Sequence, residues 1–454
     1  MPKQVAILGG GESGVGAAIL AKKEGYQVFL SDSQAISARY RSVLHENDIA
    51  YEEGGHSPDR ILAAQLVIKS PGIPDHVPLL VEVRDLGIPV VSEVEFASWY
   101  TSARLIAITG SNGKTTTSLL TYHLLKSAGL HVGLAGNVGD SFAWQVAQHQ
   151  FDYYVLEVSS FQLDNIQKFR PHISVILNIT PDHLDRYEHD FHKYVDSKFR
   201  ITENQTTEDL LIYFADSEVL DSELQKRDLP VRTVAVSLET PIEQGGYWAN
   251  DQLLSQIDGK SFTVPYGQLP IKGPHNAVNA LVAITIGLQL GLDAESIHTA
   301  LQTFVNAPHR LEPVAVIDGV TYINDSKATN VDSVYYALGS FDKPIILIAG
   351  GVDKGNDYSQ IEPLVREKLK GLIVLSPHFE KLQSYFESMV PAFFVTQDLQ
   401  EAIAKAAQWA EPEDVVLLSP ACASFDLFKN YQDRGDRFKM AVRDYANSRK
   451  DLHL

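Results

Sequence analysis

Residues 104–120, RLIAITGSNGKTTTSLL, decide the fold class of this chain. They begin with an apolar, β-branched run typical of a buried strand, pass through a glycine-rich turn and continue into a stretch with helical character. A phosphate-binding loop requires this context, because glycines let the backbone wrap around phosphates and the helix N-terminus offers N–H donors. We therefore expect residues 110–116 to bind the phosphates of a nucleotide.

Two side chains of this loop suit a nucleoside triphosphate. Lys114 would reach the terminal phosphates, and the Thr115 hydroxyl would be a ligand for Mg²⁺. The loop departs from the full eight-residue pattern, since Ile108 stands where that pattern has glycine. The alternative is a glycine-rich turn with an incidental lysine, and the order of strand, loop, Gly-Lys-Thr and helix argues against it.

The rest of the chain alternates between predicted strands and helices, which indicates an α/β protein with parallel sheets. A first segment contains the strands VAILGG, YQVFLSD and LVIKSPGIP, in that order. A second segment runs from the phosphate loop to the helix around LDAESIHTALQTF, and a third contains IILIAGG, GLIVLS and DVVLLSPA. We place the boundaries near residues 93 and 306, and we expect ligands beyond the carboxyl ends of the strands.

Composition narrows the possible partners. The 454 residues are 44% hydrophobic and carry a net charge of −19, so neither nucleic acid nor an anionic membrane is an expected partner. The N-terminus has no signal-peptide run, and the longest apolar run, 280–290, is short of the ~20 residues that span a bilayer. A single cysteine, Cys422, excludes an internal disulfide and reads as a small buried residue. A cytoplasmic protein is expected.

A second glycine-rich turn follows the first predicted strand. Gly9, Gly11 and Gly14 have the spacing of a dinucleotide fingerprint, and Asp32 ends the next strand at about the expected distance. The pattern alone is weak, because a tight turn that packs a helix on a strand has the same spacing. It indicates a nucleotide-like ligand without saying which one.

Three further side chains stand out in the second segment. Glu157 ends the strand YYVLEV, and a carboxylate at a strand's carboxyl end suits Mg²⁺. His183 follows the strand ISVILNIT, where hydrogen bonding and metal coordination are both open. Lys198 lies on a predicted helix, FHKYVDSKFRI, and from its periodicity alone it is expected to be a solvated surface lysine.

Basic and amide residues gather in GPHNAVN (273–279), APHRLEP (307–313) and NDSKATN (324–330). Arg310 and Lys327, with Asp325, could hold phosphates and a ribose or a metal. Each motif alone is commonly a surface turn. Three of them around one predicted boundary suggest a cleft between domains.

Taken together, these motifs resemble those of the Mur ligase family. The ordered set covers nearly the whole chain: SPGI, TGSNGKTT, GNVG, LEVSSFQL, PDHLDRY, the Lys198 helix, GPHN, PHRLE, NDSKATN, GGVDKG and SPACASFDLFKNYQDRGDRF. The last two motifs and the length resemble the member that adds D-glutamate to UDP-N-acetylmuramoyl-L-alanine. The DNPR motif of the members that add diaminopimelate or lysine is absent.

The resemblance implies an architecture and a reaction. It implies a Rossmann-like domain for the UDP-sugar at 1–93, a central P-loop ATPase-like domain with a mostly parallel sheet at 94–306, and a Rossmann-like domain for the amino acid at 307–454. ATP would phosphorylate the carboxylate of the UDP-sugar, and the amine of D-glutamate would displace phosphate from the acyl phosphate. A monomer with two Mg²⁺ sites, and with no nucleic-acid or membrane partner, is expected.

The resemblance also implies roles for single residues. The catalytic residues would be Lys114, Glu157, His183 and Lys198, and the metal ligands would be Thr115, Glu157, His183 and Lys198 as a carbamate. ATP would be bound by Gly110, Ser111, Asn112, Gly113, Lys114, Thr115, Thr116, Asn279, Arg310, Asp325 and Lys327. The UDP-sugar would be bound by Ser13, Gly14, Val15, Asp32, Ser70, Gly72, Asn137 and Ser159. D-glutamate would be bound by His183, Lys354, Ser424, Tyr431 and a helix N-terminus after SPACAS; the family often has Phe where Tyr431 stands, so the role of its hydroxyl stays open.

Three alternatives remain at this stage. Another amino-acid-adding relative, such as an L-alanine-adding ligase or a folylpolyglutamate synthase, differs in the amino acid that it accepts. An NAD-dependent oxidoreductase would use Gly9–Gly14 and Asp32, but hydride transfer has no need of the Gly-Lys-Thr loop. A regulator that binds nucleotide without catalysis is disfavoured by the complete set of Lys114, Glu157, His183 and Lys198.

Overall fold

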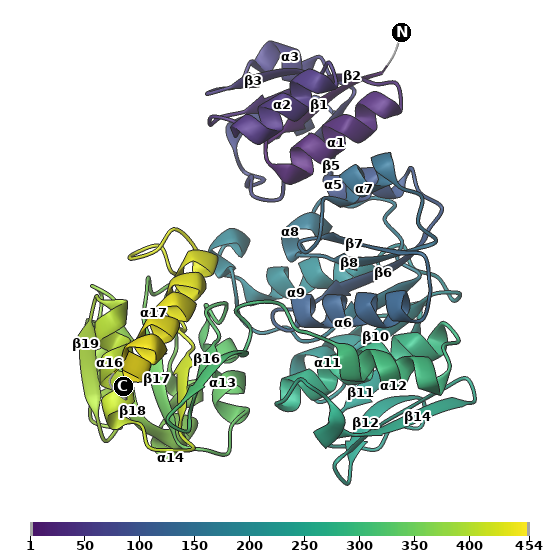
Figure 1. Cartoon of the computed structure of the whole chain (residues 1–454). Helices are drawn as coiled ribbons and strands as arrows, with labels where there is room; N and C mark the ends of the chain where they lie inside the picture. Colours follow the sequence, from purple (N-terminus) through teal and green to yellow (C-terminus); the bar gives the residue numbers. More distant parts are fainter. Residues whose placement is uncertain (1–2, 452–454) are drawn as a thin grey trace. The chain divides into compact units, whose positions relative to one another are not determined.

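The computed structural model describes residues 3–451 of the chain, which form three sheets flanked by helices (Figure 1). The N-terminal and central sheets belong to one compact unit, which extends to Pro270 and includes Val278–Phe304. The C-terminal sheet belongs to a second unit, together with Ile271–Ala277. The predicted α/β class with three domains is confirmed, and the exact boundaries near 93 and 306 stay predictions.

The N-terminal sheet has five parallel strands in the order β3-β2-β1-β4-β5. Alternate residues of β1 enter different cores: Val5 and Ile7 pack with α1 and α2, whereas Ala6 and Leu8 pack with α3 and α4. The order reverses between β1 and β4, which brings the loops after these two strands together, the usual place for a ligand in such a sheet. The elements are β1 (Gln4–Leu8), α1 (Glu12–Lys23), β2 (Gln27–Asp32), α2 (Ala38–Glu46), β3 (Ala50–Glu53), α3 (Pro58–Leu62), β4 (Leu66–Lys69), α4 (Pro78–Asp85), β5 (Val90–Ser92) and α5 (Glu93–Ser98).

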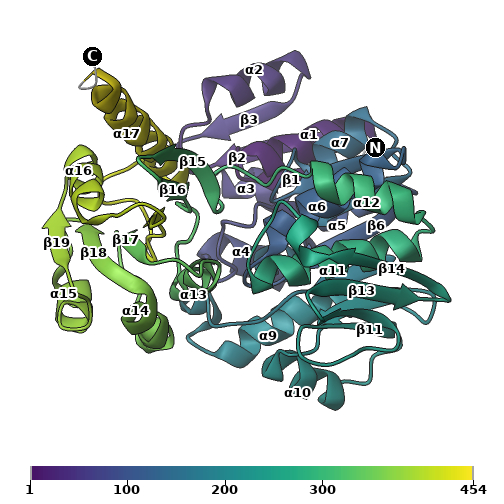
Figure 2. The same ribbon diagram turned by 60° about the horizontal axis from the view of Figure 1, so that its bottom comes forward.

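The central sheet has nine strands in the order β14-β13-β12-β11-β10-β9-β6-β8-β7. The strands from β6 to β12 pair in parallel, and β12, β13 and β14 form an antiparallel edge whose last two strands are labelled in Figure 2. Its strands are β6 (Arg104–Thr109), β7 (Val132–Gly136), β8 (Tyr153–Glu157), β9 (Ile173–Ile176), β10 (Leu210–Phe214), β11 (Arg232–Ser237), β12 (Gly245–Ala249), β13 (Gln252–Ile257) and β14 (Lys260–Pro265). Its helices are α6 (Lys114–Ser127), α7 (Phe142–Gln148), α8 (Ser160–Leu163), η1 (Leu184–Tyr187), α9 (Phe191–Phe199), η2 (Arg200–Thr202), α10 (Glu218–Lys226), η3 (Tyr266–Gln268), α11 (Pro274–Gln289) and α12 (Ala294–Thr303).

The C-terminal sheet has six strands in the order β15-β16-β20-β17-β18-β19, and only the β15–β16 pair is antiparallel among the described pairs. One face packs on α13, α14 and α15, and the other packs on α16 and α17. The strands are β15 (Glu312–Ile317), β16 (Val320–Asn324), β17 (Ile345–Ala349), β18 (Leu369–Leu375), β19 (Phe393–Thr396) and β20 (Val415–Leu418). The helices are α13 (Val331–Gly339), η4 (Ser359–Ile361), α14 (Glu362–Lys368), α15 (Glu380–Phe386), α16 (Leu399–Trp409) and α17 (Tyr431–Asp451).

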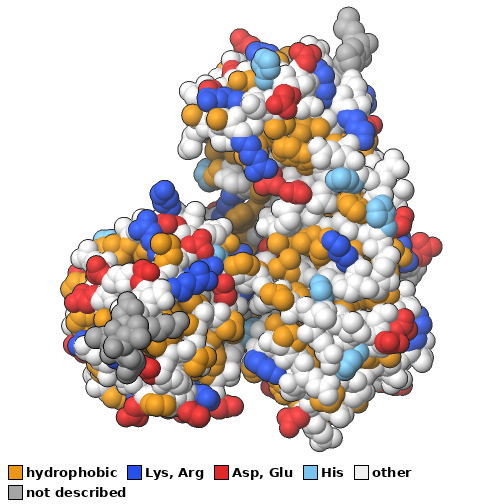
Figure 3. Space-filling model, viewed as in Figure 1, with side chains coloured by type: hydrophobic (Ala, Val, Ile, Leu, Met, Phe, Trp, Pro, Cys, Tyr) orange, Lys and Arg blue, Asp and Glu red, His pale blue; other side chains and the backbone are white. Residues whose placement is uncertain are grey.

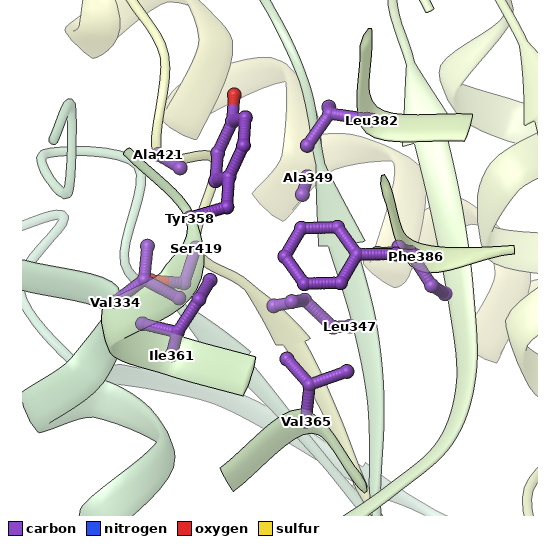
Figure 4. Close-up of a pocket in the computed structure, with 11 residues that line it drawn as sticks. Val334, Leu347, Ala349, Tyr358, Ile361, Val365, Leu382, Phe386, Ser419 and Ala421 are labelled. Atoms are coloured by element: carbon purple, nitrogen blue, oxygen red, sulfur yellow. The ribbon is translucent and has the colours of Figure 1, made fainter. Parts of the chain in front are cut away.

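A small apolar cavity lies in the first of these two C-terminal cores. Figure 4 shows the side chains of Tyr358 and Phe386 facing Leu347 across it. The free space is about 10 Å³, which is the lower limit for one water molecule. This cavity is a packing defect of the core and does not have the size or the polar groups of a ligand site.

Two sequence predictions about the fold were wrong. The sequence analysis missed β3, so the strand LVIK is the fourth of the first sheet and not the third. β3 has the short, half-exposed sequence AYEE, which gives little apolar signal. A helix does not begin directly after SPACAS: residues 421–430 form bends and turns with an isolated bridge at Ala423, and α17 begins at Tyr431.

The described surface agrees with the composition. On the face drawn in Figure 3, lysine and arginine side chains lie among aspartates and glutamates. Within residues 3–451, none of the helices has both the length and the hydropathy that crossing a bilayer requires.

Candidate active site

The glycine-rich loop after β6 has the backbone of a phosphate-binding loop. Gly113 precedes α6 with a left-handed φ of 84°, so a residue with a side chain would be strained there. A Cβ on Gly113 would also lie 2.9 Å from Oδ1 of Asn279. Asn279 accepts a hydrogen bond from the Thr117 hydroxyl at 2.9 Å. The predicted ATP residue Asn279 therefore lies against the loop, 162 positions away in sequence.

The loop is fixed by residues of the segment that follows β9. Asn178 accepts from the Asn112 N–H at 2.8 Å through its side chain, and its Nδ2 donates back to Asn112 O at 3.1 Å. Ser111 donates from its hydroxyl to Thr180 O at 2.9 Å and accepts from the Thr180 N–H. These bonds fix the loop at the helix N-terminus, where backbone N–H groups and the helix dipole favour an anion.

Two lysines meet at one carbonyl of this loop. Nζ of Lys114 donates to Gly110 O at 2.6 Å and to Ser111 O at 2.8 Å. Nζ of Lys198, which arrives on α9, donates to the same Gly110 O at 2.7 Å. The prediction that Lys198 is a solvated surface lysine was wrong: only 1% of it is exposed.

The surroundings of Lys198 change its chemistry. Burial lowers its pKa well below the ordinary value, and the nearby charge of Lys114 lowers it further. Its ammonium group also lies over the ring of Tyr194, 4.7 Å from the centroid. A lysine in this environment loses its proton much more readily than a surface lysine, and a neutral amine is a nucleophile.

Glu157 ends β8, between β6 and β7, at the same carboxyl edge of the sheet as the phosphate loop. Its side chain is buried, and its Oε2 has no hydrogen-bond partner among the described residues. An orphaned carboxylate oxygen is costly unless a cation or a donor joins it. Thr115, at the start of α6, is buried as well. A carboxylate and a hydroxyl beside a phosphate loop are a donor set that fits Mg²⁺.

Within residues 3–451, no group of three or more His, Cys, Asp or Glu side chains could hold a metal ion by itself. The carboxylate of Glu157 and the hydroxyl of Thr115 are oxygen donors that suit Mg²⁺, which takes further oxygens from phosphates and water. A closed site of the zinc type does not fit these residues.

His183 lies in the turn between β9 and η1. Its φ of 51° is left-handed, and its ring meets the edge of the Phe161 ring at 5.1 Å. The side chain is exposed on the surface of the unit. Ser159, which was predicted to bind the UDP-sugar, caps α8 in a capping box with Gln162.

The N-terminal sheet presents its two switch-point loops. Gly9 has a φ of 102°, and a Cβ there would lie 2.4 Å from Oγ of Ser70, so only glycine lets the two loops meet. Oγ of Ser70 is buried without a partner among the described residues. Asp32 accepts from the Gly10 N–H at 2.6 Å and from the Gln34 N–H at 2.8 Å, so its carboxylate braces its own loop.

The other predicted UDP-sugar residues lie on both domains of the first unit. Ser13, Gly14 and Val15 are in the first turns of α1, and Gly14 is so close to Gly9 O that a Cβ would lie 1.9 Å from it. Gly72 follows β4, and a Cβ there would meet nothing within 4 Å. Asn137 follows β7, and its N–H donates to Glu157 O at 3.0 Å.

Two carboxylates of the N-terminal domain fix the segment after Asn137. Oε1 of Glu93 accepts from the Ser141 hydroxyl at 2.7 Å and from the Ala143 N–H at 2.5 Å, and Glu12 accepts from the Ser141 N–H. Burial raises the pKa of Glu93 to about 7 despite these bonds. The start of α7 is thereby attached to α1 and α5.

The second unit gathers the predicted ATP residues of the C-terminal domain. The Lys327 N–H donates to His309 O at 3.1 Å, and Nζ of Lys327 lies 5.0 Å from the centre of the Tyr431 ring. Asp325 accepts from the Ser419 hydroxyl and from the Leu311 N–H, which follows Arg310. Burial raises the pKa of Asp325 to about 7, although these bonds oppose the rise.

The predicted D-glutamate residues lie on neighbouring loops of the same unit. Val352 and Ala423 exchange backbone hydrogen bonds at 2.8 and 3.1 Å, which joins the loop of Lys354 to the loop of Ser424. Lys354 is exposed, whereas Ser424 is buried. Cys422 is also buried, as expected, and burial raises the pKa of its thiol to about 11.

Comparison with known proteins identifies the family. Residues 4–78 match the MurD N-terminal domain, 108–287 the Mur ligase middle domain, and 309–422 the Mur ligase, glutamate ligase domain. The UDP-N-acetylmuramoylalanine--D-glutamate ligase of Christiangramia forsetii is 48% identical over 444 residues, which are 98% of this chain and 100% of that protein. The chain belongs to the Mur ligase family.

A further relative supports this assignment in sequence, and a solved structure shows the same fold. The UDP-N-acetylmuramoylalanine--D-glutamate ligase of Cytophaga hutchinsonii is 49% identical over 453 residues, 98% of this Mur ligase and 100% of that protein. The structure of a pseudomurein peptide ligase type C from Methanothermus fervidus has the same fold, with a TM-score of 0.63 at 18% identity over 98% of this chain and 100% of that one.

The sequence analysis missed a buried arginine of this Mur ligase. Arg434, on α17, donates to the hydroxyl and the carbonyl of Ser326 at 2.9 and 2.8 Å, to Cys422 O at 3.2 Å and to Gly350 O at 3.4 Å. Burial lowers its pKa to about 10. One side chain thus connects the loops that precede Lys327, Lys354 and Ser424. Its position within the motif SPACASFDLFKNYQDRGDRF was the available signal.

The structure brings the predicted residues of this Mur ligase together in two groups. Lys114, Lys198 and Asn279 meet at the phosphate loop in the first unit, and Lys327 and Tyr431 meet in the second. The GPHNAVN motif is divided: residues 273–277 belong to the second unit, and Val278 and Asn279 belong to the first. The cleft suggested by these motifs stays a prediction.

Proposed function

We propose that this chain is the ATP-dependent ligase that joins D-glutamate to UDP-N-acetylmuramoyl-L-alanine in peptidoglycan precursor synthesis. The observation that carries the proposal is the phosphate loop with two lysines on one carbonyl, beside the orphaned carboxylate of Glu157. The identity of the amino acid is supported by relatives about 48% identical over nearly the whole chain, whose names state D-glutamate.

The reaction has two steps. A carboxylate oxygen of the UDP-sugar attacks the γ-phosphorus of ATP, the bond to the bridging oxygen breaks, and ADP leaves. The amine of D-glutamate then attacks the carbonyl carbon of the acyl phosphate, loses a proton, and phosphate leaves as the amide forms. Both steps bring anions together, so cationic groups must offset charge on the transferring phosphoryl group.

Residues of the phosphate loop would carry the first step. Backbone N–H groups at the start of α6 bind the phosphates, and Lys114, within reach of the loop, neutralises the γ-phosphate as it transfers. Asn279 lies against the same loop and, with Arg310, Asp325 and Lys327 of the second unit, would complete the ATP site.

Thr115, Glu157 and His183 would hold Mg²⁺, which when bound neutralises phosphate oxygens. Lys198 would supply two further oxygens as a carbamate. Its lowered pKa favours the neutral amine, whose lone pair can attack CO₂ and release a proton to give N-carboxylate. That change replaces a buried cation beside Lys114 with an anion, which relieves the repulsion between the two lysines.

The remaining predicted residues would hold the two other substrates. Ser13, Gly14, Val15, Asp32, Ser70, Gly72, Asn137 and Ser159 would bind the UDP-sugar. His183, Lys354, Ser424 and Tyr431 would bind D-glutamate. We further propose the domain limits 1–93, 94–306 and 307–454, a monomer, and a cytoplasmic reaction, since both nucleotide substrates are expected in that compartment.

The test is release of phosphate by the purified chain with ATP, Mg²⁺ and UDP-N-acetylmuramoyl-L-alanine. The amino acid is varied among D-glutamate, L-glutamate, L-alanine and meso-diaminopimelate. Release that depends on D-glutamate, with the amide product identified by mass spectrometry, supports the proposal. Release with L-alanine or diaminopimelate instead would assign a different member of the family.

A further inference from the structure

Arg186 lies in η1, three residues after His183, and its side chain reaches the N-terminal domain. One guanidinium nitrogen donates to Pro71 O at 2.6 Å and to Ile73 O at 2.9 Å, and the other donates to Gly72 O at 3.3 Å. Three consecutive carbonyls of one loop thus accept from one side chain that is 113–115 positions away in the sequence. The planar fork of an arginine suits such a set of acceptors, whereas a lysine would reach them only as a point charge.

These bonds determine which way the loop presents its donors. In a trans peptide the N–H points opposite to the C=O. Because Pro71 O points toward Arg186, the N–H of Gly72 points away from Arg186. A Cβ on Gly72 would meet nothing within 4 Å, so this part of the loop is open. Because Gly72 has no side chain, its N–H, which points away from Arg186, can approach a phosphate oxygen closely.

A second cationic side chain, that of Lys69, also donates to this loop. Lys69, at the end of β4, is 1% exposed and donates to Ile73 O at 2.8 Å. It also pairs with Asp75 at 3.4 Å. The carbonyls of the loop are therefore satisfied by two cationic side chains, one from each domain of the first unit. This leaves the loop little freedom to turn its carbonyls outward.

Arg186 also contacts Phe161, whose ring meets that of His183. Its guanidinium carbon lies 4.3 Å from the centre of the Phe161 ring. Phe161 is in α8, four residues after Glu157, and its ring meets that of His183. A movement of the loop after β4 would thus be transmitted to the side chains at the carboxyl ends of β8 and β9.

We propose that Arg186 is a positioning residue that orients the 70–73 loop for the diphosphate of the UDP-sugar and fixes it relative to His183. The inference rests on the proposed function and adds to it a residue that touches neither substrate. Removing the side chain leaves the carbonyls of Pro71 and Gly72 without their donor, while Ile73 O keeps that of Lys69. The loop then rotates about Ile73, and the Gly72 N–H no longer faces the ligand. Binding of the UDP-sugar should weaken, and binding of ATP should not.

The experiment measures binding of UDP-N-acetylmuramoyl-L-alanine by calorimetry, and the KM of each substrate, in the full chain. In Arg186→Ala we expect the Kd for the UDP-sugar to rise by about 10-fold or more, with the KM for ATP within about twofold of the original value. Arg186→Lys should restore part of the affinity, because a charge returns without the fork. It also serves as the test variant if Arg186→Ala does not fold.

Arg84→Ala is the matched control. Arg84 also joins the two domains, since it bonds to Asp75 and to Asn165, but it touches none of the three carbonyls. Its loss should leave the Kd for the UDP-sugar within about twofold. An unchanged Kd in Arg186→Ala, an equal loss of ATP affinity, or an equal effect of Arg84→Ala would each overturn the inference. Because calorimetry measures the Kd for the UDP-sugar without turnover, a wrong amino-acid assignment would leave that part of the test intact.

Discussion

The phosphate loop of the central domain and the loop cluster of the C-terminal domain use cationic side chains in opposite ways. In the central domain, Lys114 and Lys198 share the carbonyl of Gly110, and the nearby Glu157 keeps an oxygen without a partner. In the C-terminal domain, Arg434 donates to three loops through four hydrogen bonds. In the first arrangement, charged groups are left for ligands to pair with. In the second, one charged side chain holds three loops together.

The difference predicts which substitutions reduce turnover and which reduce the stability of the fold. Substituting a lysine whose anionic partners arrive with the substrates should reduce turnover much more than stability. Substituting a buried arginine that donates to several carbonyls should also lower the stability of the fold. Four substitutions, ordered from the largest expected effect to the smallest, test this contrast.

Lys198→Ala should reduce turnover the most, by ~10³-fold or more, since the proposed carbamate oxygens that would hold Mg²⁺ are lost. Small carboxylates such as acetate or formate should restore part of the activity by supplying oxygens. Steady-state phosphate release with and without these anions is the measurement. Lys193→Ala is the control, because Lys193 lies on the same helix and pairs with Glu188 at the surface. An active, Mg²⁺-loaded enzyme whose intact mass shows an unmodified Lys198 would contradict the carbamate.

Lys114→Ala should lower kcat by on the order of 10²-fold, because the charge that offsets the transferring phosphoryl group is removed. The melting temperature should stay close to the original value, since Gly110 O keeps its hydrogen bond from Lys198 and only the bond to Ser111 O is lost outright. Turnover and thermal unfolding are measured side by side. Lys126→Ala, on the exposed end of the same helix, provides the comparison. Near-normal turnover in Lys114→Ala would show that residues 110–116 are not the phosphate loop.

Arg434→Met should reduce both the stability of the fold and the binding of substrates. Four hydrogen bonds to buried acceptors are lost, so we expect the free energy of unfolding to fall by ~2–4 kcal/mol. The KM values for ATP and D-glutamate should rise together, since the loops of Lys327, Lys354 and Ser424 share this anchor. Chemical denaturation and steady-state kinetics give the two readouts. Arg437→Met removes an exposed arginine of the same helix that pairs with Asp433, and it should change neither. A stable Arg434→Met with a changed kcat alone would give the arginine a role like that of the central lysines.

Lys354→Ala should have the smallest effect, an increase of about 10-fold in the KM for D-glutamate, as expected for loss of one exposed charge from a carboxylate site. The KM values for ATP and the UDP-sugar should change much less. Lys343→Ala removes another exposed lysine of the same domain, which pairs with Glu413. An increase confined to ATP would move Lys354 to the nucleotide side.

Local sequence was sufficient wherever a short segment contains both its structure and its chemistry. Residues 104–120 predicted a strand, a phosphate loop and a helix, and the structure has β6, the loop and α6 in that order. The strand that ends at Asp32, the helix around Lys198 and the three-domain α/β class were predicted in the same way. In each case hydrophobic periodicity and glycine placement act within a few residues.

Tertiary structure decided the environment of single charged side chains. Lys198 lies four residues after Tyr194 on the apolar face of α9, yet lysine is so rarely buried that periodicity favoured the surface. Its partner Gly110 is 88 positions away, the partners of Arg186 are up to 115 away, and Ser326 is 108 from Arg434. The sequence by itself thus determined the strands, the helices and the phosphate loop. Which cations are buried, and which loops they join, followed only from packing distant segments together, because burial depends on neighbours that no local pattern specifies.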